Sequence, residues 1–265
     1  MPKTDCMIFF KKKQPETIKG LSAELSNFEY NKECWDQYAK TWTKKNAPVE
    51  NPDVKTENKL QYVQYLGDEW GKVSDVEIII NDFIYPYITP ETIAAEIGVG
   101  GGRVASKVAG KVKQLTCFDV APEMINKAKV SLKEFTNIQF ELLENPELSE
   151  KFNAHFDFIY SFDVFVHLDL QMLWKYIYEI SNCLKPGGKA FIHTTNLKSP
   201  GGWKQFMDML NYKHGGNSLI RHYFISPETI EIFAEKCNLN IIKTSKHNPE
   251  NFYYNRDYLA VLEKR

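Results

Sequence analysis

From Thr92 onwards, short apolar segments alternate with longer segments in which apolar residues recur at helical spacing. This alternation is typical of βαβ units, in which helices connect parallel strands. Seven segments are predicted to be strands: Thr92 to Ile97, Gln114 to Phe118, Asn137 to Leu143, Phe156 to Ser161, Lys189 to Thr195, Asn240 to Thr244 and Tyr258 to Leu262. The clearest helix is expected from Asp169 to Leu184, ending at the turn Lys185-Pro186-Gly187-Gly188.

The N-terminal part of the chain, up to residue 90, contains no strand-like apolar segment, and its pattern favours helices. Trp35, Tyr38 and Trp42 recur at helical spacing, as do the apolar residues between positions 73 and 84. We interpret the three aromatic residues as packing that faces a core, with a ligand lid as the alternative. Residues 1–90 are therefore expected to form an N-terminal helical extension or lid.

The remainder, residues 91–265, is predicted to be one α/β domain built on a doubly wound, Rossmann-like sheet. Glycine and aromatic residues interrupt the alternation between residues 197 and 225, which we interpret as an insertion. A helix is expected to begin at Ser226, because Pro227 and Glu228 suit the first turn.

Composition narrows the functional class. The 265 residues are 43% hydrophobic and 25% charged, as in ordinary globular proteins, and the formal net charge of −1 gives no overall attraction to nucleic acid or anionic membranes. The five cysteines form no Cys-x-x-Cys pair, and no apolar segment is long enough for a signal peptide or a membrane span. We expect a cytoplasmic protein without nucleic-acid or membrane partners.

A glycine-rich turn follows the first predicted strand. Glu96 is followed by Gly98, Gly100 and Gly102, and the next helix begins directly afterwards. Glycines allow the backbone to turn sharply and approach a ligand, which then faces the amides at the start of a helix. The strand, turn and helix together predict a nucleotide-binding loop.

The spacing of the glycines distinguishes between nucleotides. A dinucleotide fingerprint has glycine at the sixth position of its motif, where this chain has Arg103, so NAD is not favoured. The order of Glu96, Gly98, Gly100 and Gly102 instead resembles the first motif of class I S-adenosylmethionine-dependent methyltransferases of the small-molecule type. The resemblance extends over about Thr92 to Arg265 and implies S-adenosylmethionine as the cofactor. It also implies that the last two strands form an antiparallel hairpin.

Further residues match the family in order along the chain. Asp119 ends the second strand, where a carboxylate accepts hydrogen bonds from ribose hydroxyls, although it is also placed to cap the following helix. Asn145 stands where the family usually has an aspartate that contacts adenine. Ser161 lies in the segment that, by resemblance, follows the methionine end of the cofactor and faces the methyl acceptor.

The acceptor site is predicted from residues that cover the carboxyl ends of the strands. His167 is the candidate catalytic base, with His193 and His222 in reserve, because a histidine of near-neutral pKa suits proton removal; a role as a turn residue is equally open. The insertion and the last loop supply the candidate substrate-binding residues Trp203, Arg221, His222, Tyr223, Tyr254 and Arg256. No metal-binding motif occurs, so no metal is expected.

Together these features predict a methyltransferase that transfers the methyl group in line to a small, anionic or polar metabolite. Two alternatives remain open. One is a catalytically silent binding protein or subunit with this fold, and the other is a methyltransferase that acts on a macromolecule. The oligomeric state is not predicted.

Overall fold

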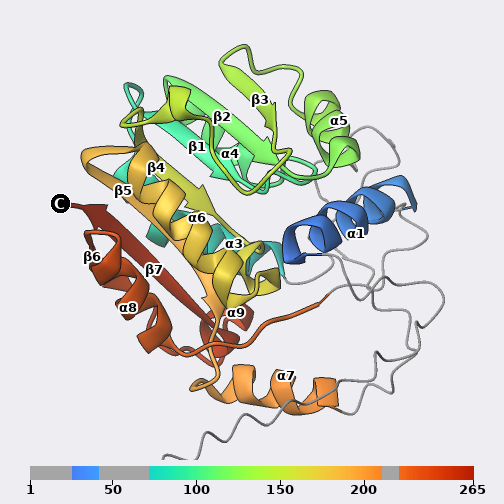
Figure 1. Cartoon of the computed structure of the whole chain (residues 1–265), viewed down its shortest axis with the longest axis vertical. Helices are drawn as coiled ribbons and strands as arrows, with labels where there is room; N and C mark the ends of the chain where they lie inside the picture. Colours follow the sequence, from blue (N-terminus) through green and yellow to red (C-terminus); the bar gives the residue numbers. More distant parts are fainter. Residues whose placement is uncertain (1–25, 42–71, 211–220) are drawn as a thin grey trace, which may run out of the picture.

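The computed structural model describes residues 26–41, 72–210 and 221–265. In this part of the chain one sheet has the strand order β3-β2-β1-β4-β5-β7-β6 (Figure 1). The strands are β1 (Ile93–Ile97), β2 (Gln114–Asp119), β3 (Ile138–Leu142), β4 (Phe156–Ser161), β5 (Leu184–Thr195), β6 (Leu239–Thr244) and β7 (Asp257–Lys264). The first five are parallel, whereas β7 pairs antiparallel with both β5 and β6. The predicted sheet and its terminal hairpin are confirmed.

Helices cover both faces of the sheet. One apolar cluster joins the sheet to α3 (Val73–Phe83), α4 (Ala105–Val108) and α5 (Pro122–Ser131). A second cluster joins it to α6 (Leu170–Cys183) and α8 (Pro227–Lys236), which lie in front of the sheet in Figure 1. Burial of these apolar side chains, at about 25 cal/mol per Å², is the main force that holds the layers together.

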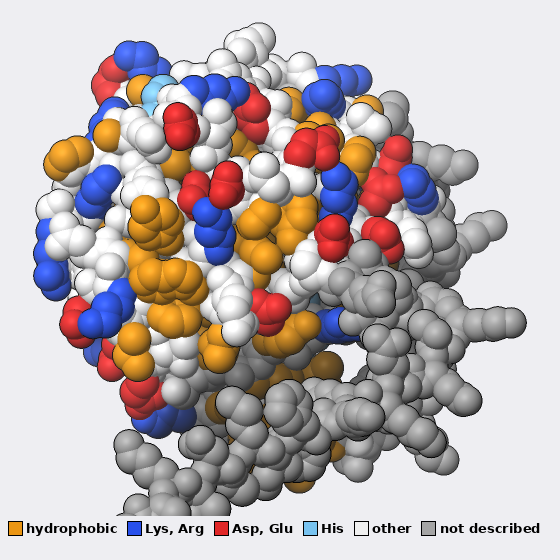
Figure 2. All heavy atoms as spheres, in the orientation of Figure 1, with side chains coloured by type: hydrophobic (Ala, Val, Ile, Leu, Met, Phe, Trp, Pro, Cys, Tyr) orange, Lys and Arg blue, Asp and Glu red, His pale blue; other side chains and the backbone are white. Residues whose placement is uncertain are grey.

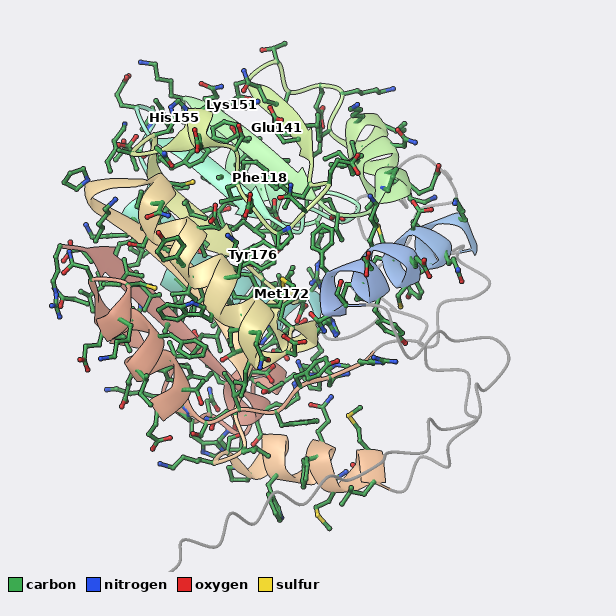
Figure 3. The ribbon with its side chains drawn as sticks, in the orientation of Figure 1. Phe118, Glu141, Lys151, His155, Met172 and Tyr176 are labelled. Atoms are coloured by element: carbon green, nitrogen blue, oxygen red, sulfur yellow. The ribbon has the colours of Figure 1, made fainter. Side chains whose placement is uncertain are left out.

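The labelled side chains of Figure 3 show how the second layer is built. Phe118 of β2 and Tyr176 of α6 both belong to the cluster between the sheet and that helix, and both are almost fully buried. On the outer side, Figure 2 shows apolar side chains on the face that α6 and α8 cover in Figure 1. Leu170 and Tyr178 of α6 and Ile232 of α8 are exposed. The sheet is therefore buried on both faces, as doubly wound sheets require.

The N-terminal helices occupy two different places. The first helix, α1 (Asn27–Thr41), lies beside α5 in Figure 1. The other, α3, buries Val76, Ile79, Ile80 and Phe83 in the main core, so this part of the extension belongs to the sheet layer. Trp42 lies outside the described residues. No helix of the described residues is long and apolar enough to cross a bilayer.

Three details differ from the sequence prediction. The predicted turn at 185–188 is an irregular part of β5, because Phe156 pairs with Leu184 and Phe158 with Lys189, leaving the intervening residues to bulge. The insertion contains helix α7 (Pro200–Leu210), and the last loop contains the short helix α9 (Phe252–Arg256). Short 3₁₀ turns occur at η3 (Tyr85–Tyr87), η4 (Ala109–Lys111), η5 (Glu150–Phe152) and η6 (Phe165–His167).

Candidate active site

A pocket lies where the direction of strand order reverses, between β1 and β4. In doubly wound sheets this switch point leaves a crevice at the carboxyl ends of the strands. The pocket is lined by Glu96, the loop residues Gly98, Val99, Gly100, Gly101, Arg103 and Val104, then Asp119, Met124, Phe162, Asp163, Val164 and His167, and finally Trp35 and Tyr38 of α1. Residues far apart in the sequence thus share one site.

The glycine loop adopts backbone conformations that other residues rarely take. The φ angles of Gly98, Gly100 and Gly102 are +80°, +54° and +93°. A Cβ atom at Gly98 would lie 2.3 Å from Val164 Cγ2, so the loop and the segment after β4 are in close contact there. At Gly100 a Cβ would meet nothing within 4 Å, which leaves this side of the loop open to a ligand.

The Asp119 carboxylate is held against this loop. Its two oxygens accept hydrogen bonds of 2.9 Å from the amides of Gly100 and Ala121. Burial nevertheless raises the pKa of Asp119 to about 6, and these amide hydrogen bonds only partly oppose the shift. Helix α5 has its N-cap at Ala121, so Asp119 is not the cap of that helix.

Glu96 lies beneath the same loop. Its carboxylate accepts a 3.0 Å hydrogen bond from the Tyr160 hydroxyl, and its side chain is almost inaccessible to solvent. Burial raises the pKa of Glu96 to about 8, since desolvation outweighs the Tyr160 hydrogen bond and the charge of Arg103. Glu96 therefore retains its proton at neutral pH in the ligand-free protein.

His167 is fixed in one tautomer. Its Nδ1 lies 2.7 Å from the carbonyl oxygen of Arg221, which accepts only, so Nδ1 carries the proton. The Nε2 atom then has a lone pair, and no described residue donates a hydrogen bond to it. Burial, aided by the nearby His222, lowers the pKa of His167 to about 3, whereas the sequence analysis expected a near-neutral value.

Helix α1 forms one wall of the pocket. The side-chain amides of Asn27 and Asn31 donate to the His167 carbonyl at 3.2 Å, which fixes one side of the helix to the segment after β4. Trp35 and Tyr38 line the pocket and also pack against Met124 of α5. Trp35 and Tyr38 therefore pack against α5 and also lie where a ligand in the pocket would contact them.

An ion pair lies on the side of the pocket that follows β4. Arg103 donates to the Asp163 carboxylate at 2.7 Å, and the two side chains are only 8% and 12% exposed. Burial alone would raise the pKa of Asp163, but the charge of Arg103 and the hydrogen bond from its guanidinium hold it below its usual range. Sequence analysis identified neither residue as part of the site, because the signal is a contact between positions 60 residues apart.

Part of the predicted acceptor site comes together beside His167. The His222 ring lies 4.7 Å from the His167 ring, and burial lowers the pKa of His222 to about 4. The Arg221 guanidinium lies over the Tyr30 ring at 3.7 Å, and Tyr223 donates from its backbone to the Val166 carbonyl. These three predicted residues border the pocket wall formed by α1 and η6.

Five other predicted residues lie outside the pocket. Asn145 is exposed and caps the Glu147 amide, whereas Ser161 is fully buried and donates to the Ile97 carbonyl. The Tyr254 hydroxyl bonds to Asp82 near α3, and Trp203 is 54% exposed on α7. Arg256 is paired with its neighbour Asp257. None of the five lines the pocket, and all but Trp203 have side chains that are already hydrogen-bonded or ion-paired elsewhere, so we do not retain them as direct ligand contacts.

Metal binding finds no support in the described residues, since these contain no group of three or more His, Cys, Asp or Glu side chains that could hold an ion. Independence from metal stays a prediction.

Comparison with known proteins addresses the nature of the pocket. Residues 94–188 match a family model described as a methyltransferase domain, and this range includes the glycine loop, Asp119 and His167. The resemblance stated from the sequence is confirmed for this segment.

Curated relatives match this chain over part of their own length. The ubiquinone biosynthesis O-methyltransferase of Xanthomonas euvesicatoria pv. vesicatoria is 28% identical over 102 residues, which are 38% of this chain and 42% of that protein. The protein of the same name from Xanthomonas campestris pv. campestris is 26% identical over 108 residues, or 40% and 44% of the two chains. This chain thus spans less than half the length of these relatives.

Solved structures share the fold over most of the chain. Magnesium protoporphyrin IX methyltransferase from Synechocystis PCC 6803, with bound S-adenosylmethionine, has a TM-score of 0.63 at 12% identity and covers 92% of this chain and 100% of its own. The N-methyltransferase NodS from Bradyrhizobium japonicum, in complex with S-adenosylhomocysteine, has a TM-score of 0.54 at 17% identity, covering 87% and 98%. At such identities the likeness establishes the fold alone.

Proposed function

We propose that this chain is an S-adenosylmethionine-dependent methyltransferase that acts on a small, anionic or polar acceptor. The observation that carries the proposal is a single pocket that combines the glycine loop, the buried Asp119 carboxylate and the proton-free Nε2 of His167. The matched family model supports the same assignment.

The pocket suits this cofactor in three respects. The open side of Gly100 leaves room for a ligand against the backbone, and the Asp119 carboxylate beside it suits a ribose diol. Trp35, Tyr38 and Met124 provide apolar surface for the adenine of the cofactor. When bound, S-adenosylmethionine supplies a methyl group on a sulfonium: a nucleophile bonds to the methyl carbon in line as the carbon–sulfur bond breaks, and a neutral thioether leaves.

The residues of the chain then have to orient the acceptor, exclude water and receive a proton. His167 is suited to the last task, because its Nε2 stays unprotonated above about pH 4 and its ring is fixed by the Arg221 carbonyl. With so low a pKa it is a weak base. It is therefore best suited to accept a hydrogen bond from a hydroxyl that becomes acidic during methyl transfer.

Arg221 is the better of the two candidate arginines for an acceptor anion. Arg256 is already neutralised by Asp257, with Nη2 2.6 Å from the carboxylate. Among the described residues no carboxylate lies within 4.0 Å of Arg221, whose guanidinium rests on Tyr30 and whose backbone carbonyl contacts His167. A cation on the residue that fixes His167 is suited to hold a carboxylate of the acceptor in a charge-assisted pair.

Two measurements test the proposal. Calorimetry should show binding of S-adenosylmethionine and S-adenosylhomocysteine, and no binding of NAD. Transfer of a labelled methyl group to small hydroxylated acids, each compared with its neutral amide, should then reveal the acceptor class. Arg221→Ala should raise KM for the acid by roughly tenfold and leave the amide unchanged. Arg265→Ala, at an exposed arginine far along the chain, is the matched control.

A second pair of variants tests His167. His167→Ala should lower kcat by about 10²-fold or more, while His155→Ala, at the opposite end of β4 (Figure 3), should not. Cofactor binding without turnover of any small acceptor would favour a silent binding protein or a macromolecular acceptor. Binding of NAD in place of S-adenosylmethionine would refute the proposal.

A further inference from the structure

Asp163 has an unusual backbone conformation for its place beside the pocket. Its φ angle is +58°, in the left-handed region that non-glycine residues rarely adopt. Its carboxylate accepts hydrogen bonds from Arg103 at 2.7 Å and from the Tyr253 hydroxyl at 3.0 Å. Such strain persists only where surrounding contacts hold the residue in place.

The contact that holds the Asp163 backbone comes from His193, which is completely buried at the end of β5. The Asp163 amide donates a 3.0 Å hydrogen bond to His193 Nδ1. Because an amide only donates, Nδ1 must be unprotonated and the proton must lie on Nε2. His193 therefore has the opposite tautomer to His167.

The other ring nitrogen of His193 faces Asp257, the first residue of β7. The Nε2 atom lies 2.9 Å from Asp257 Oδ2, although the approach does not have the geometry of a linear hydrogen bond, so the contact is mainly electrostatic. The Asp257 carboxylate favours a proton on Nε2, and it is itself fixed by Arg256. Asp257, His193, Asp163 and Arg103 thus form a continuous buried chain that ends at the pocket.

We propose that His193 and Asp257 are positioning residues for the candidate active site. Asp257 selects the tautomer of His193, His193 holds Asp163 in its left-handed conformation, and the Asp163 carboxylate fixes Arg103 against the pocket. Neither His193 nor Asp257 lines the pocket. The expected effect on ligand affinity rests on the proposed function, whereas the tautomer of His193 does not.

The tautomer is measured first, in the ligand-free protein. Two-bond ¹H–¹⁵N correlation spectra should show His193 with its proton on Nε2 and His167 with its proton on Nδ1. A proton on Nδ1 of His193 would overturn the positioning chain, whatever the protein binds.

Affinity for S-adenosylhomocysteine is measured next, with two substitutions that differ in the atom they retain. His193→Asn keeps an acceptor at the position of Nδ1, whereas His193→Gln moves its amide to the position of Nε2 and leaves no acceptor at the position of Nδ1. We expect His193→Gln to weaken binding about tenfold and His193→Asn to stay within about threefold of the wild type. Equal losses in the two variants at equal thermal stability would contradict a positioning role.

A double-mutant cycle separates positioning from general stability. Asp163→Gly removes the carboxylate, and glycine adopts the left-handed conformation without a hydrogen bond to His193. Adding His193→Gln to this variant should therefore cause no further loss of affinity. Multiplying losses would show that His193 acts independently of Asp163 and would overturn the proposal. If His193→Gln does not fold, the tautomer and His193→Asn decide. Absence of S-adenosylhomocysteine binding by the wild type would refute the proposed function alone.

Discussion

The most direct test of the cofactor site replaces Asp119 by asparagine. This change keeps the size of the side chain and one acceptor oxygen, which can still receive the 2.9 Å hydrogen bond from the Gly100 amide. It replaces the second oxygen, which accepts from the Ala121 amide at 2.9 Å, by an NH₂ group, which donates and can accept from neither that amide nor a ribose hydroxyl. Loss of one charge-assisted hydrogen bond, worth about 1.5 to 3 kcal/mol, should weaken S-adenosylhomocysteine binding by roughly tenfold to a hundredfold.

The pH dependence of S-adenosylhomocysteine affinity gives a second, independent test of Asp119. Burial raises the pKa of Asp119 to about 6 in the free protein, and only the ionised carboxylate accepts from both hydroxyls. Affinity should therefore fall as pH decreases through 6. With one proton involved, the ionised fraction drops from about nine-tenths at pH 7 to about one-tenth at pH 5, so wild-type affinity should fall about tenfold. The asparagine variant should show no such dependence.

Calorimetric titration at pH 5, 6 and 7 measures both effects. Thermal unfolding of the two proteins at the same pH values controls for loss of structure. If the variant bound as tightly as the wild type at pH 7, Asp119 would not contact the ribose. If instead the pH dependence persisted in the variant, another group would have to carry it.

Three further predictions concern stability, metals and the N-terminal segment. Burial raises the pKa of Glu96 to about 8, so the folded state keeps a proton that the unfolded state releases near pH 4.5. The free energy of unfolding should therefore fall by up to roughly 5 kcal/mol as the pH rises from about 4.5 to about 8. Urea unfolding of Glu96→Gln should lack this contribution to the pH dependence. Turnover should be unaffected by EDTA, and its loss with recovery on adding Mg²⁺ or Zn²⁺ would overturn the metal-free interpretation. Removal of residues 1–85 should give an insoluble or inactive protein, because α3 buries Phe83 and three other apolar side chains in the main core; a soluble, active truncation would make the segment accessory.

The sheet was predictable because its signals are local. Each strand is a short apolar run with its own boundaries, and Phe156 to Ser161 is found where the pattern predicts it. The glycine loop was predictable for the same reason, since Glu96 to Gly102 are contiguous and their residue types specify the turn. The register irregularity of β5 was not, because proline and glycine at 186 and 187 are also the residues of an ordinary turn.

The rest of the site depends on contacts between distant positions. His167 is fixed by a carbonyl 54 residues away, and Asp163 by His193 and Tyr253 at separations of 30 and 90 residues. The spacing of apolar residues along the sequence does not indicate which distant residues are in contact. Asn145 and Ser161 were assigned from the order of family landmarks, and that order does not specify whether a side chain points into the pocket or away from it.

The start of α7 shows how this fold separates what must stay constant from what can change. A Cβ at Gly202 would lie 2.0 Å from the Asn196 carbonyl oxygen and 2.7 Å from that of Arg256, so the first turn of α7 is locked against the segment that precedes β7. From Trp203 to Leu210 the helix extends away from that anchor, and Leu210 is 65% exposed. Substitutions along the outer turns of α7 can therefore accumulate without moving the glycine loop. A descendant of this protein could therefore diverge along α7 while its glycine loop and Asp119 are inherited unchanged.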